Sequence, residues 1–204
     1  NKKIKSKPTI MMNPFQFNFK DNSIAELERF TKEVLDKIDG KSGTRRKKMY
    51  KRGNMHPEPK GSYSITFGYT NMSYLSKTKR RMPSDISGLY YTKLRAEHPE
   101  LKGILQQLVD LHSPEKITVD QVQINRCWRS PPHRDAGNVG ESSIIGLGNY
   151  IGGETIVEYS PEHIQEYDIK NKFVRFDGSR YTHYTYPFSG ERYSLVFYNH
   201  KKLG

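Results

Sequence analysis

The chain of 204 residues is long enough for one domain with its own core, and its single cysteine excludes both a disulfide framework and a cysteine-rich zinc site. No apolar run approaches the roughly 18 residues of a membrane-spanning helix, and no hydrophobic leader is visible. The net charge of +12 favours a polyanionic partner, nucleic acid before an anionic membrane, and the cysteine usage favours a reducing, intracellular compartment.

The first predicted helix follows a basic arm at residues 1–22. Ser23 and Glu26 form a capping box, in which the serine hydroxyl and the glutamate side chain each accept a main-chain N–H at the helix start. Apolar side chains then recur with helical spacing from Ile24 to Ile38. We expect this helix to pack its apolar stripe on a sheet.

A strongly basic segment comes next. Residues 41–52 hold seven basic and no acidic side chains, including the consecutive Arg45, Arg46, Lys47 and Lys48. A second basic cluster spans 77–81, with tyrosines nearby. Basic and aromatic side chains together suit phosphates and bases, although a solvated loop explains the composition as well.

The remaining elements are one helix and a series of short strands. Alternation predicts a strand from Ser62 to Tyr69, and helical spacing predicts an amphipathic helix from Pro99 to Leu111. Short apolar runs predict further strands at 117–128, 143–150, 154–159, 172–176, 181–186 and 192–199.

A candidate metal site is the most informative pattern. His133 and Asp135 lie two residues apart, so on a strand both side chains would leave the same face, and His183 follows far downstream. Two histidines and one carboxylate in this order are typical of the facial triad that binds non-haem Fe(II) and leaves positions open for co-substrate and dioxygen. An exposed polar pair is the alternative for His133 and Asp135 taken alone.

A candidate carboxylate site lies close behind the last histidine. Arg192 and Ser194 are again two apart on a predicted strand, which would put a guanidinium fork and a hydroxyl on one face. That pair can hold a carboxylate bidentately. Both patterns together are much less readily explained as surface residues than either one alone.

Two helices followed by many short strands predict an α+β chain, mainly β, with a double-stranded β-helix core of the jelly-roll or cupin kind. We expect one domain over residues 1–204. Its parts would be the basic arm at 1–22, a helical support with basic loops at 23–116 and the catalytic core at 117–202. The helices would back one sheet, and the metal would lie in the open mouth between the sheets.

The metal and carboxylate motifs resemble those of the Fe(II)/2-oxoglutarate dioxygenases. Within them, the sequence is most similar to the TET/JBP group, on three segments: His133–Asn138, Ser142–Gly153 and Arg192–His200. The resemblance covers mainly residues 117–202. The chain is short and lacks the cysteine-rich region of the animal enzymes, so it looks like the compact members of the group.

The resemblance implies that His133, Asp135 and His183 bind Fe(II). It also implies that Arg192 and Ser194 hold the distal carboxylate of 2-oxoglutarate, with dioxygen as the second co-substrate. The single domain would then be a dioxygenase domain.

Further residues would contact the co-substrate and the base. Arg126 or Arg129 could meet the other carboxylate, although an exposed strand face explains both equally well. The resemblance implies that Asn138 hydrogen-bonds a flipped base, Tyr198 stacks on it and His200 contacts its polar edge. From the residues alone, Asn138 could instead cap a turn and Tyr198 could be core.

The implied activity is oxidation of the 5-methyl group of 5-methylcytosine or thymine in methylated DNA. We expect a double-stranded substrate, and the segment Arg45–Lys48 would help to bind it. We expect a monomer with no obligate protein partner and no membrane association, located in the nucleus if the cell is eukaryotic. A prolyl, lysyl or small-molecule hydroxylase and a non-catalytic DNA-binding module are the alternatives.

Overall fold

The structure is a computed structural model, and it describes residues 29, 35–38, 61–71, 84–113 and 115–201. Four of the segments singled out above lie outside the described residues. They are the basic arm, the capping box at Ser23, the segment Arg45–Lys48 and the basic cluster at 77–81. Their roles therefore stay predictions.

Strands are the main regular structure of the described residues. Among the elements whose bounds fall in the described residues, the 3-10 turn η1 (Leu35–Lys37) comes first, and the helices are α3 (Lys93–Glu97) and α4 (Leu101–His112). The strands are β1 (Tyr63–Phe67), β2 (Tyr69–Asn71), β3 (Leu89–Tyr91), β4 (Val122–Arg126), β5 (Asn138–Leu147), β6 (Tyr150–Gly152), β7 (Thr155–Ser160), β8 (His163–Tyr167), β9 (Val174–Phe176), β10 (Thr182–Thr185), β11 (Phe188–Gly190) and β12 (Tyr193–His200).

The main sheet has the strand order β1-β4-β12-β5-β9, and every neighbouring pair is antiparallel. Its register aligns Ser64, Asn125 and Ser194 across three strands. β1 lies before residue 117, so the sheet takes one edge strand from the half of the chain expected to be a support.

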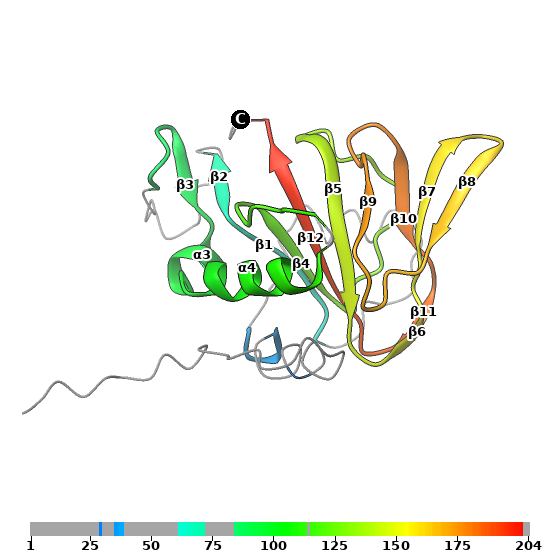
Figure 1. Cartoon of the computed structure of the whole chain (residues 1–204), viewed down its shortest axis with the longest axis horizontal. Helices are drawn as coiled ribbons and strands as arrows, with labels where there is room; N and C mark the ends of the chain where they lie inside the picture. The colour runs from blue at the N-terminus through cyan, green and yellow to red at the C-terminus, as the bar shows by residue number, and fades with distance from the viewer. Residues whose placement is uncertain (1–28, 30–34, 39–60, 72–83, 114, 202–204) are drawn as a thin grey trace, which may run out of the picture.

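A smaller sheet with the order β10-β7-β8 and a two-stranded sheet of β11 and β6 complete the β structure of the core. The chain passes from the main sheet through β6 to β7 and β8, returns for β9, leaves for β10 and β11 and ends in β12 (Figure 1). This alternation between two antiparallel sheets is the predicted double-stranded β-helix.

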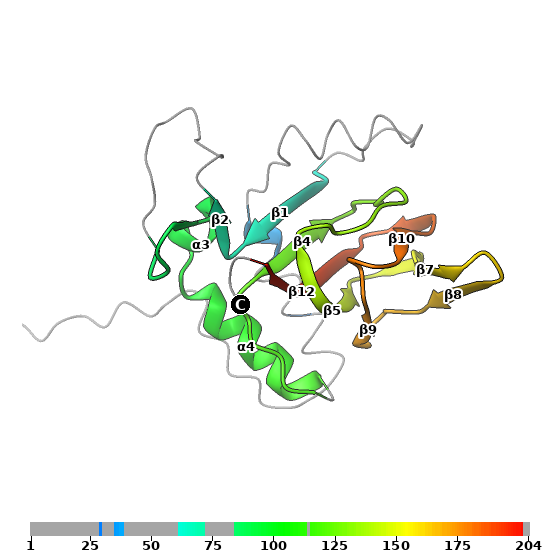
Figure 2. The same cartoon turned by 90° about the horizontal axis from the view of Figure 1, so that it is seen from above.

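The two faces of the main sheet differ because strand side chains alternate. One face carries apolar residues such as Ile124, Leu195 and Ile145, which form the larger hydrophobic cluster together with Leu105 and Leu108 of α4. Figure 2 shows α4 beside this sheet, while the β7–β8 hairpin extends from the opposite end of the molecule. The helix thus covers one face and leaves the other, more polar face available for a site.

The predicted helix at Pro99–Leu111 is confirmed as α4, and the predicted strands at 62–69, 154–159, 181–186 and 192–199 correspond to β1, β7, β10 and β12 with shifted ends. None of the helices in the described part of the chain is long and apolar enough to cross a membrane.

Candidate metal and co-substrate site

Main-chain hydrogen bonds fix the spacing of the two histidines. His133 lies in the loop after β4 and His183 lies in β10, and the two residues form an isolated antiparallel bridge. The N–H of His133 donates to the carbonyl of His183 at 3.1 Å, and the N–H of His183 donates back at 3.0 Å. Asp135 is tied to the same region, since its N–H donates to the carbonyl of Gly178 at 2.8 Å.

Each imidazole is oriented by a carbonyl two residues earlier. Nδ1 of His133 lies 2.7 Å from the carbonyl oxygen of Pro131, and Nδ1 of His183 lies 3.1 Å from that of Tyr181. A carbonyl can only accept, so both Nδ1 atoms carry the hydrogen. The lone pair of each neutral ring is therefore on Nε2, which is the tautomer a metal ligand needs.

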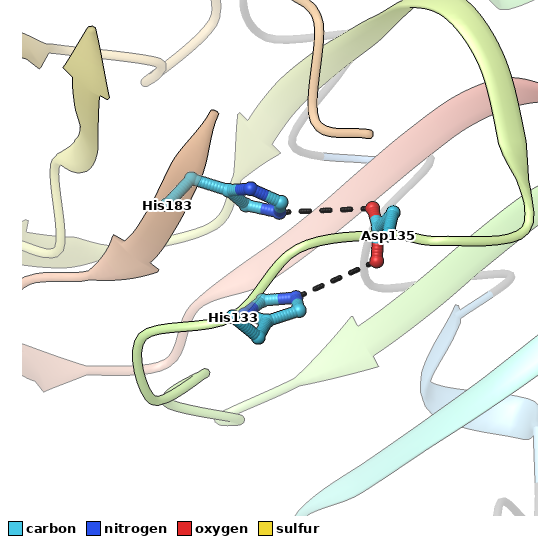
Figure 3. Close-up of side chains that lie close together, drawn as sticks. All are labelled: His133, Asp135 and His183. Carbon is cyan, nitrogen blue, oxygen red and sulfur yellow. Dashed lines mark ion pairs between the residues drawn. The ribbon is translucent and has the colours of Figure 1, made fainter. Parts of the chain in front are cut away.

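The two Nε2 atoms face the same carboxylate. Nε2 of His133 lies 3.6 Å from Oδ1 of Asp135, and Nε2 of His183 lies 3.6 Å from its Oδ2 (Figure 3). One ligand atom from each residue lies within 4.8 Å of the others, a spacing at which the three side chains could hold one metal ion. Two imidazoles and a carboxylate suit Fe(II) and leave coordination positions open.

His183 is the most enclosed of the three. Burial and then the neighbouring His133 lower its pKa, an effect that the Asp135 carboxylate opposes. The imidazole is therefore neutral at neutral pH and available as a ligand. The ring of Phe176 lies 4.9 Å from that of His183 and forms an apolar wall beside it.

A pocket opens beside the triad. It is lined by the triad residues, by polar side chains of the main sheet and by β10; the residues beyond the triad are Gln123, Asn125, Ser130, Asn138, Ile144, Thr155, Phe176, Tyr184, Thr185, Ser194, Val196 and Tyr198. The triad and the polar face of the main sheet thus share one cavity.

Arg192 does not itself line this cavity; it lies two residues before the pocket-lining Ser194, and its guanidinium contacts Gly153, two residues before the pocket-lining Thr155. Arg192 is 1% exposed, its Nη2 donates to the carbonyl of Gly153 at 2.9 Å, and its guanidinium lies over the rings of Tyr150 and Phe188. Burial lowers the pKa of Arg192, an effect that Tyr150 opposes. Among the described residues, its Nε has no hydrogen-bond partner.

Tyr150 has the same deficit. Its buried hydroxyl has no hydrogen-bond partner among the described residues, and burial raises its pKa to about 12, so the hydroxyl keeps its hydrogen at neutral pH. The neighbouring Arg192 interacts with this hydroxyl and opposes the shift. The Nε–H of Arg192, buried without an acceptor among the described residues, suits a carboxylate ligand, because an unsatisfied buried donor is costly.

The two other predicted co-substrate residues are not brought to the pocket. Arg126 points to the apolar-cluster side of β4, where Nη2 donates to Oε1 of Glu191 at 2.7 Å and lies 3.5 Å from Oδ1 of Asp36. Arg129 is half-buried, and its Nε has no hydrogen-bond partner among the described residues, but it does not line the pocket.

The three predicted base contacts have different environments. Asn138 is buried in the pocket, and its Nδ2 donates to Oδ2 of Asp135 at 3.2 Å and lies 3.5 Å from Oγ of Ser142. Tyr198 is half-buried and lines the pocket at a β-bulge in β12. His200 pairs with Asn138 across β12 and β5 and lies beside Gly137, and it does not line the pocket.

Several residues of the site have no strong signal in the sequence. Ser130, Thr155 and Thr185 are common polar residues in loops and strands, and only folding brings them to the pocket. Tyr150 is one of 14 tyrosines. Its position in the segment Ser142–Gly153, two residues before a Gly-Gly pair, is the hint that the sequence offers.

No family model and no curated protein matches the sequence. Among solved structures, NgTET1 in complex with 5mC DNA is similar with a TM-score of 0.47 and 16% identity, over 87% of this chain and 69% of that chain. A 2OG-Fe(II) oxygenase family oxidoreductase from Burkholderia pseudomallei is similar with a TM-score of 0.43 and 17% identity, over 89% of this chain and 92% of that chain. A prolyl hydroxylase from Trichoplax adhaerens, in complex with a hypoxia inducible factor peptide, has a TM-score of 0.43 and 10% identity, over 89% of this chain and 78% of that chain. At such low identities and TM-scores, these similarities assign no activity to this chain.

Proposed function

We propose that the protein is an Fe(II)- and 2-oxoglutarate-dependent dioxygenase that oxidises the 5-methyl group of a pyrimidine in DNA. The observation that carries the proposal is the convergence of His133, Asp135 and His183, with both Nε2 atoms aimed at one carboxylate, on a pocket lined by Ser194, two residues after the buried Arg192. Each of these features fits one of the two cofactors.

Fe(II) is the metal that the ligand set suits, and the Nε–H of Arg192 suits a dicarboxylate. When bound, iron, 2-oxoglutarate and dioxygen together supply the oxidation, in which one oxygen atom enters the substrate C–H bond and the other enters succinate as CO2 leaves. His133, Asp135 and His183 would hold the metal. Arg192, together with Ser194, would hold the distal carboxylate of the co-substrate.

The protein's own contribution is orientation and enclosure. The carbonyls of Pro131 and Tyr181 keep both ligand nitrogens turned toward Asp135. The burial of Arg192 removes competing water, which strengthens its attraction for a carboxylate. Phe176 closes one side of the triad with an apolar ring.

A nucleic-acid substrate is supported by charge and by the pocket side chains. The net charge of +12 attracts phosphates, and extrusion of a base costs a few kcal/mol that phosphate contacts can offset. Tyr198 offers an aromatic face and Asn138 an amide in the same pocket as the triad. The resemblance of three motifs to the TET/JBP group favours a 5-methylpyrimidine.

The test is mass spectrometry of nucleosides after incubation of the protein with Fe(II), 2-oxoglutarate, ascorbate and methylated double-stranded DNA. Hydroxymethylated cytosine or uracil is expected, with an equivalent amount of succinate. Succinate without an altered base would keep the oxygenase and redirect the search to a protein or small-molecule substrate. If neither product forms, the proposal fails.

The ligand variant is His183→Ala, which should lower product formation to background and abolish Fe(II) binding while leaving DNA affinity and the melting temperature of the apoprotein largely unchanged. His163→Ala is a matched control, because His163 is exposed on β8 and outside the pocket. Retained turnover in His183→Ala would refute the role of His183.

A further inference from the structure

A chain of side-chain hydrogen bonds crosses the polar face of the main sheet and ends at the pocket. It joins side chains of β1, β4 and β12, in the order Thr66, Gln123, Ser64, Asn125 and Ser194. Of these, Gln123, Asn125 and Ser194 line the pocket, whereas Ser64 and Thr66 do not. Ser64, Asn125 and Ser194 are at most 6% exposed.

The direction of this chain is set at one fixed point. Nε2 of Gln123 lies 2.6 Å from the main-chain carbonyl oxygen of Ile65, and a carbonyl can only accept. The nitrogen of this amide is thereby fixed on the β1 side, where it also donates to Oγ of Ser64 at 3.0 Å. The Ser64 oxygen is therefore an acceptor toward Gln123.

The direction of each following bond depends on the one before it. Ser64 has one hydroxyl hydrogen, and it goes to Oδ1 of Asn125 at 2.6 Å. With its oxygen turned to Ser64, Asn125 presents Nδ2 to Oγ of Ser194 at 3.0 Å. The Ser194 oxygen accepts this bond, so its own hydrogen cannot point back at Asn125 and is free to point into the pocket.

We propose that Ser64 is a positioning residue that fixes the Ser194 hydroxyl as a hydrogen-bond donor toward the carboxylate of the bound co-substrate. The inference rests on the proposed function, and it adds to it a residue on β1 that contacts neither metal nor co-substrate. Without the Ser64 hydroxyl, the Asn125 amide can turn over and accept the Ser194 hydrogen. The pocket then loses a donor to an anion.

Thr66 provides the matched control on the same strand. Its hydroxyl donates to Oε1 of Gln123 at 2.9 Å, at the far end of the chain. Thr66→Val removes a hydroxyl of the network, but the Ile65 carbonyl still fixes the Gln123 amide, so the direction of the remaining bonds is unchanged. Ser64→Ala and Thr66→Val should therefore differ, although each removes one hydroxyl from β1.

The experiment is calorimetric titration of the Mn(II)-loaded protein with 2-oxoglutarate in the absence of oxygen, and separately with pyruvate, which lacks the distal carboxylate. Ser64→Ala should weaken 2-oxoglutarate binding roughly tenfold, the effect of losing one hydrogen bond to a charged group. Pyruvate and Mn(II) affinities should stay at the wild-type value, as should 2-oxoglutarate affinity in Thr66→Val. Ser64→Thr, which keeps the hydroxyl, should restore binding.

A second variant covers the case in which Ser64→Ala is unstable. An aspartate at position 125 offers only acceptors, so it would accept the hydroxyl hydrogen of Ser194. Asn125→Asp should therefore weaken the binding of 2-oxoglutarate more than that of pyruvate. Equal 2-oxoglutarate affinity in wild type and Ser64→Ala would overturn the role of Ser64 and leave the proposed function standing. If the wild-type protein binds pyruvate and 2-oxoglutarate equally, or neither, the proposed function and this inference both fail.

Discussion

Asn138 has two candidate roles at the scale of single residues. The TET/JBP resemblance gives it a contact with the base, whereas its Nδ2 donates to Oδ2 of Asp135 at 3.2 Å. A partner that orients a metal ligand has a measurable effect on the metal, and its loss typically costs 10–100-fold in metal affinity or activity. The two roles therefore predict different measurements.

We expect Asn138→Ala to weaken Fe(II) or Mn(II) binding by roughly tenfold or more, because the Asp135 carboxylate loses a partner that fixes its orientation. Metal titration of the apoprotein measures this directly. Asn199→Ala is the matched control, since Asn199 is exposed on β12. Unchanged metal affinity together with a raised KM for DNA would instead assign Asn138 to the base.

The candidate ligand residues can be predicted from the sequence because their chemistry is specific and the spacing of the first two is short. His133 and Asp135 lie two residues apart, and few patterns other than a metal site combine them with a later histidine and Arg192-x-Ser194. Arg126 cannot be distinguished from a site residue in this way. Its side of β4 and its pairing with Glu191 depend on the strand register, which is a property of the folded sheet.

At the scale of elements, the turn between β6 and β7 lies against Arg192, the proposed carboxylate ligand. Gly153 has φ +77°, and a Cβ there would lie 2.8 Å from Nε of Arg192. Gly88 has the same φ of +77°, but a Cβ there would meet nothing within 4 Å. The two glycines thus share the backbone strain that a side chain would impose and differ in what it would touch.

We expect Gly88→Ala to destabilise the fold by about 1–2 kcal/mol, because it places an L-residue in the left-handed region, and Gly153→Ala to destabilise it more, because its Cβ would also meet the buried Arg192 side chain. Only Gly153→Ala should also weaken 2-oxoglutarate binding, by roughly tenfold, since the displaced guanidinium loses a charge-assisted hydrogen bond. Melting curves and titration with 2-oxoglutarate separate the two effects. Equal 2-oxoglutarate affinities in both variants would contradict the role of this turn.

The sequence predicts long periodic elements better than short ones. The stripe from Leu101 to Val109 predicts α4 because several turns repeat the same spacing. The sequence pattern does not reveal β3, α3, β8 and β11, which have three to five residues each and little periodicity. β8 is exposed along most of its length, so no apolar alternation marks it.

At the scale of the whole molecule, the excess of positive charge gives a prediction for DNA binding. Changing Arg45, Arg46, Lys47 and Lys48 to glutamine removes four positive charges from one short segment. If these side chains neutralise phosphates, DNA affinity at low salt should fall, and the slope of log K against log salt should decrease by about 0.9 for each phosphate that is no longer neutralised. Fluorescence anisotropy at several salt concentrations measures both.

The control removes the same charge elsewhere. Lys93, Lys102, Lys116 and Lys172 are at least partly exposed and lie outside the pocket, so their change to glutamine removes the same net charge away from it, and a melting curve checks that the ion pairs lost at Lys93, Lys102 and Lys172 leave the fold intact. An equal loss of affinity in both variants would show a diffuse electrostatic effect. An unchanged DNA affinity in the first variant would mean that Arg45–Lys48 is a solvated loop without a role in DNA binding.

The main-chain bridge between His133 and His183 sets the backbone spacing of the two candidate ligands before any ion arrives. A distance fixed in this way cannot adjust itself to select among divalent ions of similar size. Nickel, copper and zinc bind imidazole and carboxylate ligands more tightly than ferrous iron in the Irving–Williams order. Occupancy by iron would then depend on the metals available around the protein, and trace zinc or copper would act as poisons that a chelator followed by fresh ferrous iron reverses.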